Sequence, residues 1–160
     1  GPGLCYTKGA MKKVVPLLAI AALLTGCATV SYQTAAPLPG ETLSVHQTLS
    51  KYEGTVDLPC RFRTSLCPNR CDHGGKYAKF SVVEYTGYEK PGKYGDEKQA
   101  EFLVRVAHKD GTPDEATPEA LRKVIAALEP GQVVGLDWTH VYVTQGGVSA
   151  PERIVTRLAE

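Results

Sequence analysis

The chain has 160 residues, of which 42% are hydrophobic and 22% are charged, a composition typical of a folded globular protein rather than of a disordered one. This length suits one domain with a tail. The formal net charge is +1, but the part from Cys27 onward carries 15 basic and 17 acidic side chains, a charge of −2. That balance argues against a nucleic-acid-binding domain, which would show an overall basic excess.

Residues 11–26 carry the pattern of a secretion signal. Met11, Lys12 and Lys13 form a positive start, and the apolar run VVPLLAIAALL follows over residues 14–24. The run is too short to span a bilayer, which takes about 20 residues, and it suits the apolar core of a signal peptide. Residues 1–10 do not begin with Met, and we treat them as an added or upstream segment outside the fold.

The apolar run ends in Leu24-Thr25-Gly26-Cys27. These residues resemble the lipobox of bacterial lipoproteins, in which the cysteine is acylated and the chain is cut just before it. The resemblance implies a mature chain that begins at a lipidated Cys27, carries acyl chains such as palmitate, and is anchored to the cell envelope facing the periplasm. Two or three acyl chains suffice for stable anchoring. Ala28 in place of Asp favours the outer membrane in a Gram-negative host.

The lipidated cysteine is followed by a predicted tether and then by one domain. Residues 27–42 are small, polar and rich in Pro, which predicts a flexible linker. The domain covers residues 43–160. Alternating apolar residues predict strands at residues 52–58, 78–85 and 102–108, with Gly54 suited to a bulge and a one-residue slip in the alternation at Val83.

A helix and two further strands are predicted after these. Thr117 is the expected N-cap, Pro118 the first helical residue and Glu119 an acid in the first turn. Pro130-Gly131 ends the helix. Strands are expected at residues 133–143 and 153–158, separated by a turn at residues 145–147. The predicted helix buries one apolar stripe, formed by Leu121, Val124, Ile125 and Leu128. Strand 133–143 is expected to bury one face, formed by Val134, Leu136, Trp138, His140 and Tyr142.

The order of elements is three strands, one helix and two strands. It resembles the OB-fold, a mainly β, five-stranded Greek-key barrel with one helix between strands three and four. The alternative is an α+β domain in which the helix lies across an open antiparallel sheet. The segment GQVVGLDWTHVYVT (residues 131–144), with PER at 151–153, also resembles the C-terminal hairpin of small bacterial envelope lipoproteins. That likeness implies no particular activity.

The most informative local pattern is a cluster of thiols between the first two predicted strands. Cys60, Cys67, Cys71 and His73 have the spacing C-x6-C-x3-C-x-H. In an oxidising envelope, two of the three cysteines are expected to form a disulfide that staples the loop. Which two would pair is left open by the sequence.

Two other interpretations of this loop remain open. The Cys3His set suits zinc or copper, although its spacing differs from that of known zinc fingers. Arg61, Arg63 and Arg70 lie beside the thiols and would lower a thiol pKa, which suits redox chemistry. His46, His108 and His140 are further metal ligands only if the fold brings them to the cysteines.

Basic residues with interleaved tyrosines extend from Arg61 to Lys93 and predict a binding face. Such a face suits a glycan, an anionic headgroup or an envelope protein, while an envelope address disfavours nucleic acid. No motif of a known enzyme class is present in the sequence, so we expect a non-enzymatic binding or interaction module. The predicted face comprises Arg61, Arg63, Tyr77, Lys79, Tyr85 and Tyr88.

Overall fold

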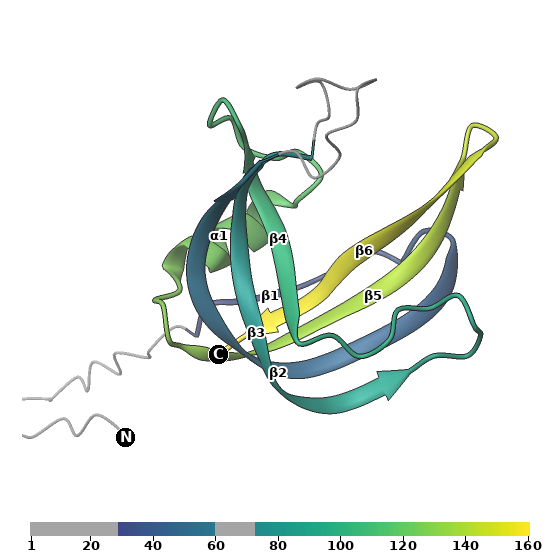
Figure 1. The fold of residues 1–160 in the computed structure, drawn as a ribbon, viewed down its shortest axis with the longest axis horizontal. Coiled ribbons are helices and arrows are strands. Elements are labelled where there is room, and N and C mark those ends of the chain that lie inside the picture. The colour runs from purple at the N-terminus through teal and green to yellow at the C-terminus, as the bar shows by residue number, and fades with distance from the viewer. Residues whose placement is uncertain (1–28, 60–72) are drawn as a thin grey trace, which may run out of the picture.

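The structure is a computed structural model that describes residues 29–59 and 73–160. The signal segment and Cys27 lie outside the described residues. Among the residues that are described, no helix is long and apolar enough to cross a membrane. Figure 1 shows the elements in chain order: β1 (Ser31–Gln33), β2 (Glu41–Leu58), β3 (Gly75–Glu89), β4 (Glu101–His108), α1 (Glu119–Ala127), β5 (Val133–Gln145) and β6 (Val148–Ala159).

The strands form one antiparallel sheet in the order β1-β6-β5-β2-β3-β4. The long strand β2 lies at its centre, where it pairs with β5 over Glu41–Lys51 and with β3 over Val45–Leu58. The sheet is strongly curved, so that β3 and β4 stand against β5 and β6 across a concave side (Figure 1). Sharing β2 between both halves makes the curved sheet a single unit.

Two irregularities in β2 and β3 help to bend the sheet. The pairing register shifts between Tyr52 and Gly54, and Gly54 has a φ of +94°, a conformation that glycine adopts without strain. A second shift leaves Val83 unpaired between Val82 and Glu84. Both positions were predicted from the sequence, and both are confirmed. Bulges of this kind increase the local twist and bend the strand that contains them.

The predicted closed, five-stranded barrel is wrong, whereas the mainly β class and the helix between β4 and β5 are confirmed. The sheet has six strands and stays open, because β4 and β6 do not pair with each other. Part of the reason lies in the loop after β4, which folds back along its edge. The N–H of His108 donates to the carbonyl of Thr112 at 2.8 Å, and that of Asp114 donates to Val106 at 3.1 Å. The part of this edge from Val106 onward is therefore not available to β6.

The predicted linker also contains a strand. Ser31–Gln33 pairs with Arg157–Ala159 of β6, and Tyr32 packs against the core. Burying an aromatic side chain offsets the entropy lost when a short segment is ordered. The linker was predicted from its composition, which does not take this burial into account. The strand β2 likewise begins at Glu41, inside the range that we assigned to the linker.

The helix packs on the concave side, and its apolar stripe is confirmed. Leu121, Val124, Ile125 and Leu128 are all buried. The predicted N-cap is wrong, because Pro118 occupies that position and the Thr117 hydroxyl instead donates to the carbonyl of Arg105 at 2.7 Å. Thr117 therefore ties the start of the helix to β4. The remaining core residues come from the sheet: Tyr52, Ala78, Phe80, Phe102, Val104, Val134, Leu136, Trp138, Val155 and Leu158.

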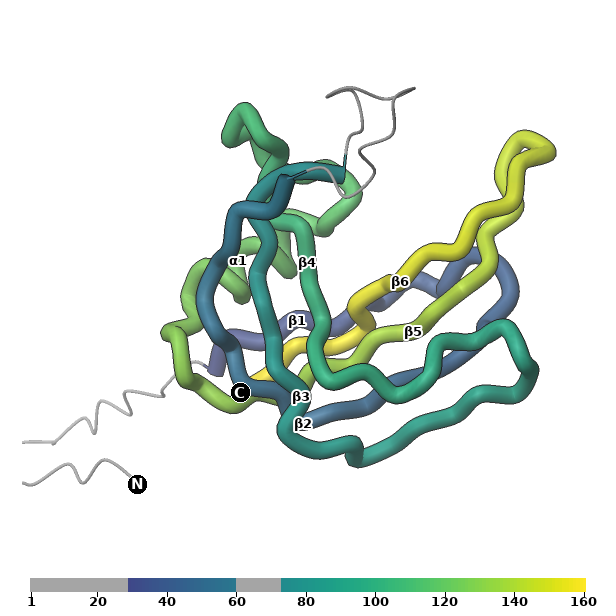
Figure 2. The backbone as a smooth tube through the Cα atoms, in the orientation of Figure 1, coloured from purple at the N-terminus to yellow at the C-terminus, as the bar shows by residue number. Residues whose placement is uncertain are grey.

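The predicted buried face of β5 is confirmed over most of its length. Trp138 is fully buried and His140 is 4% exposed, whereas Tyr142 is 42% exposed because the strand there runs out beyond the core. The loop between β3 and β4, residues 90–100, returns along the concave side in front of β5 (Figure 2). This loop carries Asp96 into the site described next.

Candidate functional site

The predicted cysteine loop is only partly described. Cys60, Cys67, Cys71, Arg61 and Arg63 lie outside the described residues. His73, the last member of the predicted set, is exposed, and its backbone carbonyl accepts a hydrogen bond of 2.6 Å from the hydroxyl of Tyr77. His73 and Tyr77 both line a groove beside β4.

The described members of the predicted binding face do not form one surface. Tyr77 lines the groove, and Lys79 pairs with Glu101 at 3.0 Å. Tyr85 and Tyr88 instead approach His46, with ring centroids 6.0 and 5.2 Å from the imidazole. The two register shifts that leave Val83 and Thr86 unpaired explain this division, because each changes the face to which the following residues of β3 point.

The groove, which we call the β4–β6 groove, runs between the edge of β4 and β6. It consists of two adjoining cavities of about 700 and 710 Å³. Buried Phe102, Leu121 and Val155 contribute apolar surface. The start of α1 closes one end. The residues that line both cavities come from three elements and the loop before β3: His73, Tyr77, Phe102, Leu103 and Arg153.

An ion pair forms the polar wall of this groove. Arg153 on β6 donates two hydrogen bonds to the Asp96 carboxylate, at 2.7 Å from Nε and 2.8 Å from its terminal nitrogen. The same carboxylate lies 3.3 Å from Nδ1 of His140. The Asp96 backbone N–H points inward, where it donates to His140 Nδ1 at 3.2 Å and to the Ser44 hydroxyl at 3.1 Å.

A chain of hydrogen bonds continues from Ser44 into the interior. The Ser44 hydroxyl lies 2.9 Å from His46 Nε2, and His46 Nδ1 lies 3.2 Å from the Tyr85 hydroxyl. The Gln99 N–H donates to this same hydroxyl at 2.7 Å. Because Ser44 already accepts from Asp96, its proton is available for His46 Nε2, and the network assigns the His46 proton to Nδ1. With His46 neutral, every hydrogen bond in this chain has one donor and one acceptor.

Burial and nearby charges set the protonation of this cluster. Burial lowers the pKa of His46 and that of His140, and the negative charge of Asp96 opposes both shifts. Burial would raise the pKa of Asp96, but the hydrogen bonds and charge of Arg153 lower it below its ordinary value. Neutral histidines beside an ionised Asp96 are the resting state at neutral pH.

Aromatic rings pack around the same histidine. His46 stacks on Trp138 with ring centroids 4.6 Å apart, and Phe102 stacks on Trp138 at 4.3 Å. Lys98 lies over Tyr85 and Tyr88, at 5.2 and 5.6 Å from their ring centroids. These contacts connect the groove residue Phe102 to the buried polar chain.

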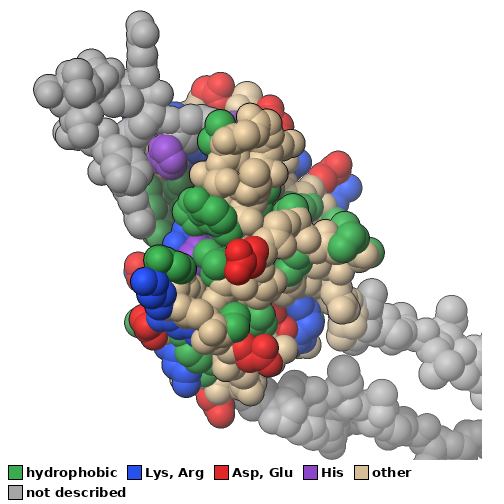
Figure 3. All heavy atoms as spheres, turned by 90° about the vertical axis from the view of Figure 1, so that its right-hand side faces the viewer, with side chains coloured by type: hydrophobic (Ala, Val, Ile, Leu, Met, Phe, Trp, Pro, Cys, Tyr) green, Lys and Arg blue, Asp and Glu red, His purple; other side chains and the backbone are tan. Residues whose placement is uncertain are grey.

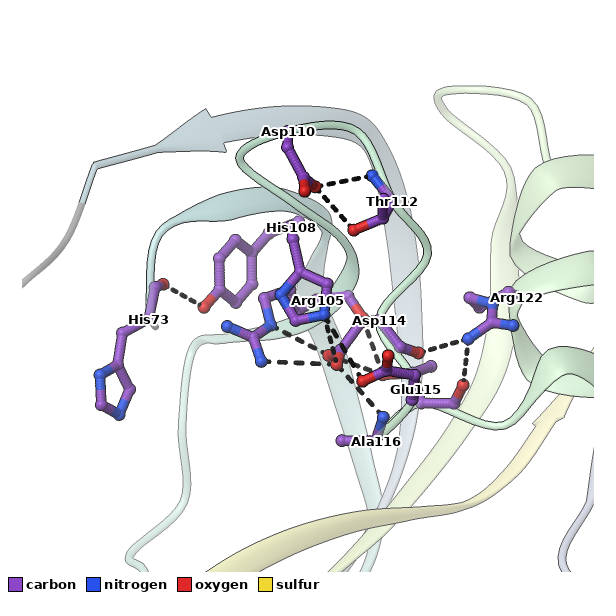
Figure 4. Close-up of polar contacts among 11 residues, drawn as sticks. His73, Arg105, His108, Asp110, Thr112, Asp114, Glu115, Ala116 and Arg122 are labelled. Atoms are coloured by element: carbon purple, nitrogen blue, oxygen red, sulfur yellow. Dashed lines mark hydrogen bonds and ion pairs between the residues drawn. The ribbon is translucent and has the colours of Figure 1, made fainter. Parts of the chain in front are cut away.

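A second polar cluster fixes the far end of the groove (Figure 4). Arg105 Nε donates to the Asp114 carboxylate at 3.0 Å, and His108 Nε2 lies 3.8 Å from that group. Burial would raise the Asp114 pKa, but the Arg105 hydrogen bond lowers it. Arg122 of α1 donates to the carbonyls of Asp114 and Thr117. This cluster holds the β4–α1 loop against the edge of β4.

The geometry favours binding over nucleophilic chemistry in this region. Ser44 and His46 are adjacent in the manner of a nucleophile and its base, but both are 0% exposed, so no substrate reaches the hydroxyl. Within residues 29–59 and 73–160, no group of three or more His, Cys, Asp or Glu side chains is arranged to hold a metal. The buried chain therefore acts as a support for the groove wall.

The sequence analysis missed most of this support. Ser44, His46, Thr48 and Ser50 occupy alternate positions of β2, where polar alternation ordinarily indicates a solvent face, yet all four are buried. Leu49, on the opposite face, is 38% exposed. One available signal was the length of the β2 segment, because a long strand is expected at the centre of a sheet. A central strand of a curved sheet turns the side chains of its concave face towards the interior.

Comparisons with known proteins found no match: no family model, no curated protein and no solved structure resembles this chain. The functional argument therefore depends on the residues themselves. In Figure 3, which views the molecule from the right-hand side of Figure 1, acidic and basic side chains are interspersed with small hydrophobic groups. Recognition at such a face depends on shape and hydrogen bonding more than on a field of one sign.

Proposed function

We propose that this chain is a bacterial envelope lipoprotein, acylated at Cys27, whose β domain is a non-enzymatic binding module. The order of elements supports an OB-type domain in which the barrel is left open between β4 and β6. The lipobox-like segment supports the anchor and the periplasm-facing location, with the outer membrane favoured in a Gram-negative host.

The observation that carries the binding proposal is the β4–β6 groove. Ligand sites are concave, mostly apolar and provided with a few fixed polar groups. The groove combines apolar Phe102 and Leu121 with Arg153, whose two hydrogen bonds to Asp96 fix its orientation. Its volume is in the range of known binding sites.

The anchor is tested by metabolic labelling of the full chain with an alkyne fatty acid in a Gram-negative host. The wild type should be labelled and should fractionate with the envelope. Cys27→Ala should lose the label, whereas Cys5→Ala should keep it, because Cys5 precedes the predicted cleavage site. A labelled Cys27→Ala chain, or an unlabelled wild type, would contradict the anchor.

Binding at the groove is tested in the same cells with a photo-crosslinking amino acid. The crosslinker is placed at Leu103 or Glu152 in the groove, or at Val83, a control residue that is 62% exposed and lies outside the groove. Adducts should form from the two groove positions and not from the control. Equal yields at all three positions, or none at any, would contradict a binding role for the groove.

A further inference from the structure

Within the described residues, the edge strand β4 and the part of β6 that β1 does not cover both border the groove with unpaired backbone groups. The edge of β4 is covered from Val106 onward by its own loop. In β6, only Arg157–Ala159 is paired with β1, and Thr156 accepts one bond from Thr34. On the side that borders the groove, residues 101–104 of β4 and 152–155 of β6 therefore have no strand neighbour among the described residues, and the Arg105 carbonyl there accepts from the Thr117 hydroxyl.

The β4 edge presents its hydrogen-bonding groups in a defined pattern. The N–H of Val82 donates to the carbonyl of Ala100 at 2.8 Å, and Phe80 pairs with Phe102 in the same register. Because backbone groups alternate in direction along an antiparallel pair, Phe102 and Val104 bond to β3, while Glu101 and Leu103 point outward. Unprotected edges of this kind are templates for pairing with another chain.

The topology sets the direction that a strand added between these edges would have. Every neighbouring pair from β6 through β5, β2 and β3 to β4 is antiparallel, so β4 and β6 run in the same sense. Direct pairing of β4 with β6 would be parallel, which is the slightly weaker arrangement. One inserted strand that runs the opposite way is antiparallel to both edges and would close β6, β5, β2, β3 and β4 into a barrel.

The chain contains a short precedent for such a strand. At the other end of β6, β1 lies on the same edge and runs antiparallel to it. Strand addition is also a known mode of peptide recognition, in which main-chain bonds give affinity and alternate side chains give specificity.

The charges of the groove indicate the side chain of the partner. Glu101 pairs with Lys79, Asp114 with Arg105, and Arg153 with Asp96. Glu152 is exposed and has no ion pair among the described residues. A basic side chain on the inserted strand would complement it.

Resting on the proposed binding function, we infer that the groove receives an extended segment of a partner protein as an added strand. The segment carries a basic side chain, hydrogen-bonds to the outward groups of Glu101 and Leu103, and runs antiparallel to both β4 and β6.

The test starts from a displayed library of random peptides of about seven residues, long enough to span the edge of β4, selected on the purified full chain. Leu103→Pro removes the outward N–H, and Leu103→Ala keeps it. We expect about ten-fold weaker binding of the selected peptide to the Pro variant than to the Ala variant. Thermal unfolding of both variants establishes that each is folded, since proline is tolerated on edge strands.

Nuclear magnetic resonance gives the direction of the strand. Peptide binding should slow amide exchange at Glu101 and Leu103. A nitroxide on the peptide N-terminus should broaden Arg105 more than Glu101, as an antiparallel strand requires. If Leu103→Pro unfolds, the exchange and broadening measurements on the wild type decide the question.

The outcomes separate this inference from the function that it rests on. Equal binding by the Pro and Ala variants, the reverse pattern of broadening, or pairing of two copies through β4 would overturn strand addition. A library without any binder would also overturn it. In each case the crosslinks from Leu103 and Glu152 decide separately whether the groove binds a different ligand.

Discussion

Arg153 and Asp96 join two parts of the chain that are far apart in sequence, through hydrogen bonds of 2.7 and 2.8 Å. Arg153 lies on β6 and Asp96 in the loop between β3 and β4. The pair therefore fixes the width of one end of the β4–β6 groove. Asp96 in turn contacts His140, so the same pair also positions a buried imidazole.

Removing the Arg153 side chain should loosen this connection. The guanidinium is 43% exposed, so we expect Arg153→Ala to lower the free energy of unfolding by about 1–2 kcal/mol. Arg153→Lys keeps the charge but cannot make the two parallel hydrogen bonds, so its free energy of unfolding should lie between those of the wild type and Arg153→Ala. The control is Lys123→Ala, which removes an exposed pair with Glu119 that solvent screens and should therefore change stability much less. Urea denaturation measures all three, and equal losses for Arg153→Ala and Lys123→Ala would contradict the structural role.

Stability should depend on pH through His46 and His140. Burial lowers the pKa of each in the folded protein, while in the unfolded chain each returns to its ordinary value of 6.5. The unfolded state thus binds more protons below pH 6.5, and stability falls as the pH is lowered through that value towards the folded pKa. When His46 is protonated, its Nε2 carries a hydrogen and can no longer accept the hydrogen bond from the Ser44 hydroxyl.

Urea denaturation at a series of pH values between 7.5 and 5 measures this effect. Replacing His46 by Gln removes one titrating group and should flatten the profile. Val83→Ala is the control, because this exposed side chain does not titrate, and it should keep the pH dependence of the wild type. A profile that is flat in the wild type would contradict the burial of neutral histidines. Asp96, whose pKa is lowered mainly by Arg153 against the effect of burial, adds a further loss only below its ordinary value of 3.8.

The stack of Phe102 on Trp138 should be a major source of stability. Phe102 is 6% exposed, Trp138 is fully buried, and their ring centroids lie 4.3 Å apart. Phe102→Ala should cost about 3–5 kcal/mol, whereas Val83→Ala at an exposed bulge should change stability by less than about 0.5 kcal/mol. Trp138 is the only tryptophan, so its fluorescence reports the unfolding directly. A cost for Phe102→Ala no larger than that of Val83→Ala would show that the stack is not part of the core.

The sequence predicted the elements that depend on local patterns. The apolar stripe of Leu121, Val124 and Ile125, the bulge at Gly54 and the slip at Val83 each follow from a few neighbouring residues. It did not predict that the sheet stays open. That outcome depends on how the loop after β4 covers the strand from Val106, a contact that no local pattern specifies.

The candidate site was harder to predict for a related reason. Asp96, Arg153 and Ser44 come from three distant segments, and their meeting depends on the path of the loop at residues 90–100. Ser44 and His46 were misleading as well, since polar residues at alternate positions favour a solvent face. In this fold their side chains are buried because they satisfy one another.

The cysteine loop provides the last prediction, which concerns residues outside the described part. In an oxidising envelope we expect one disulfide among Cys60, Cys67 and Cys71 and one remaining thiol. A bridge between Cys60 and Cys71 would close about 12 residues and contribute about 3 kcal/mol on the chain-entropy estimate. Thiol titration of the purified, processed chain in denaturant without reductant should therefore give one free thiol, because Cys27 is occupied by its acyl group.

Elemental analysis of the same sample distinguishes the two other interpretations. No bound metal is expected with the disulfide. Three free thiols with one equivalent of zinc or copper would contradict the disulfide and would indicate a metal site that includes His73. A thiol count that follows a mild redox buffer, with reduction of a model disulfide, would instead indicate redox chemistry. Replacing each cysteine in turn by Ser identifies the bridge. Replacing a paired cysteine frees its partner and raises the number of free thiols, whereas replacing the unpaired cysteine lowers it.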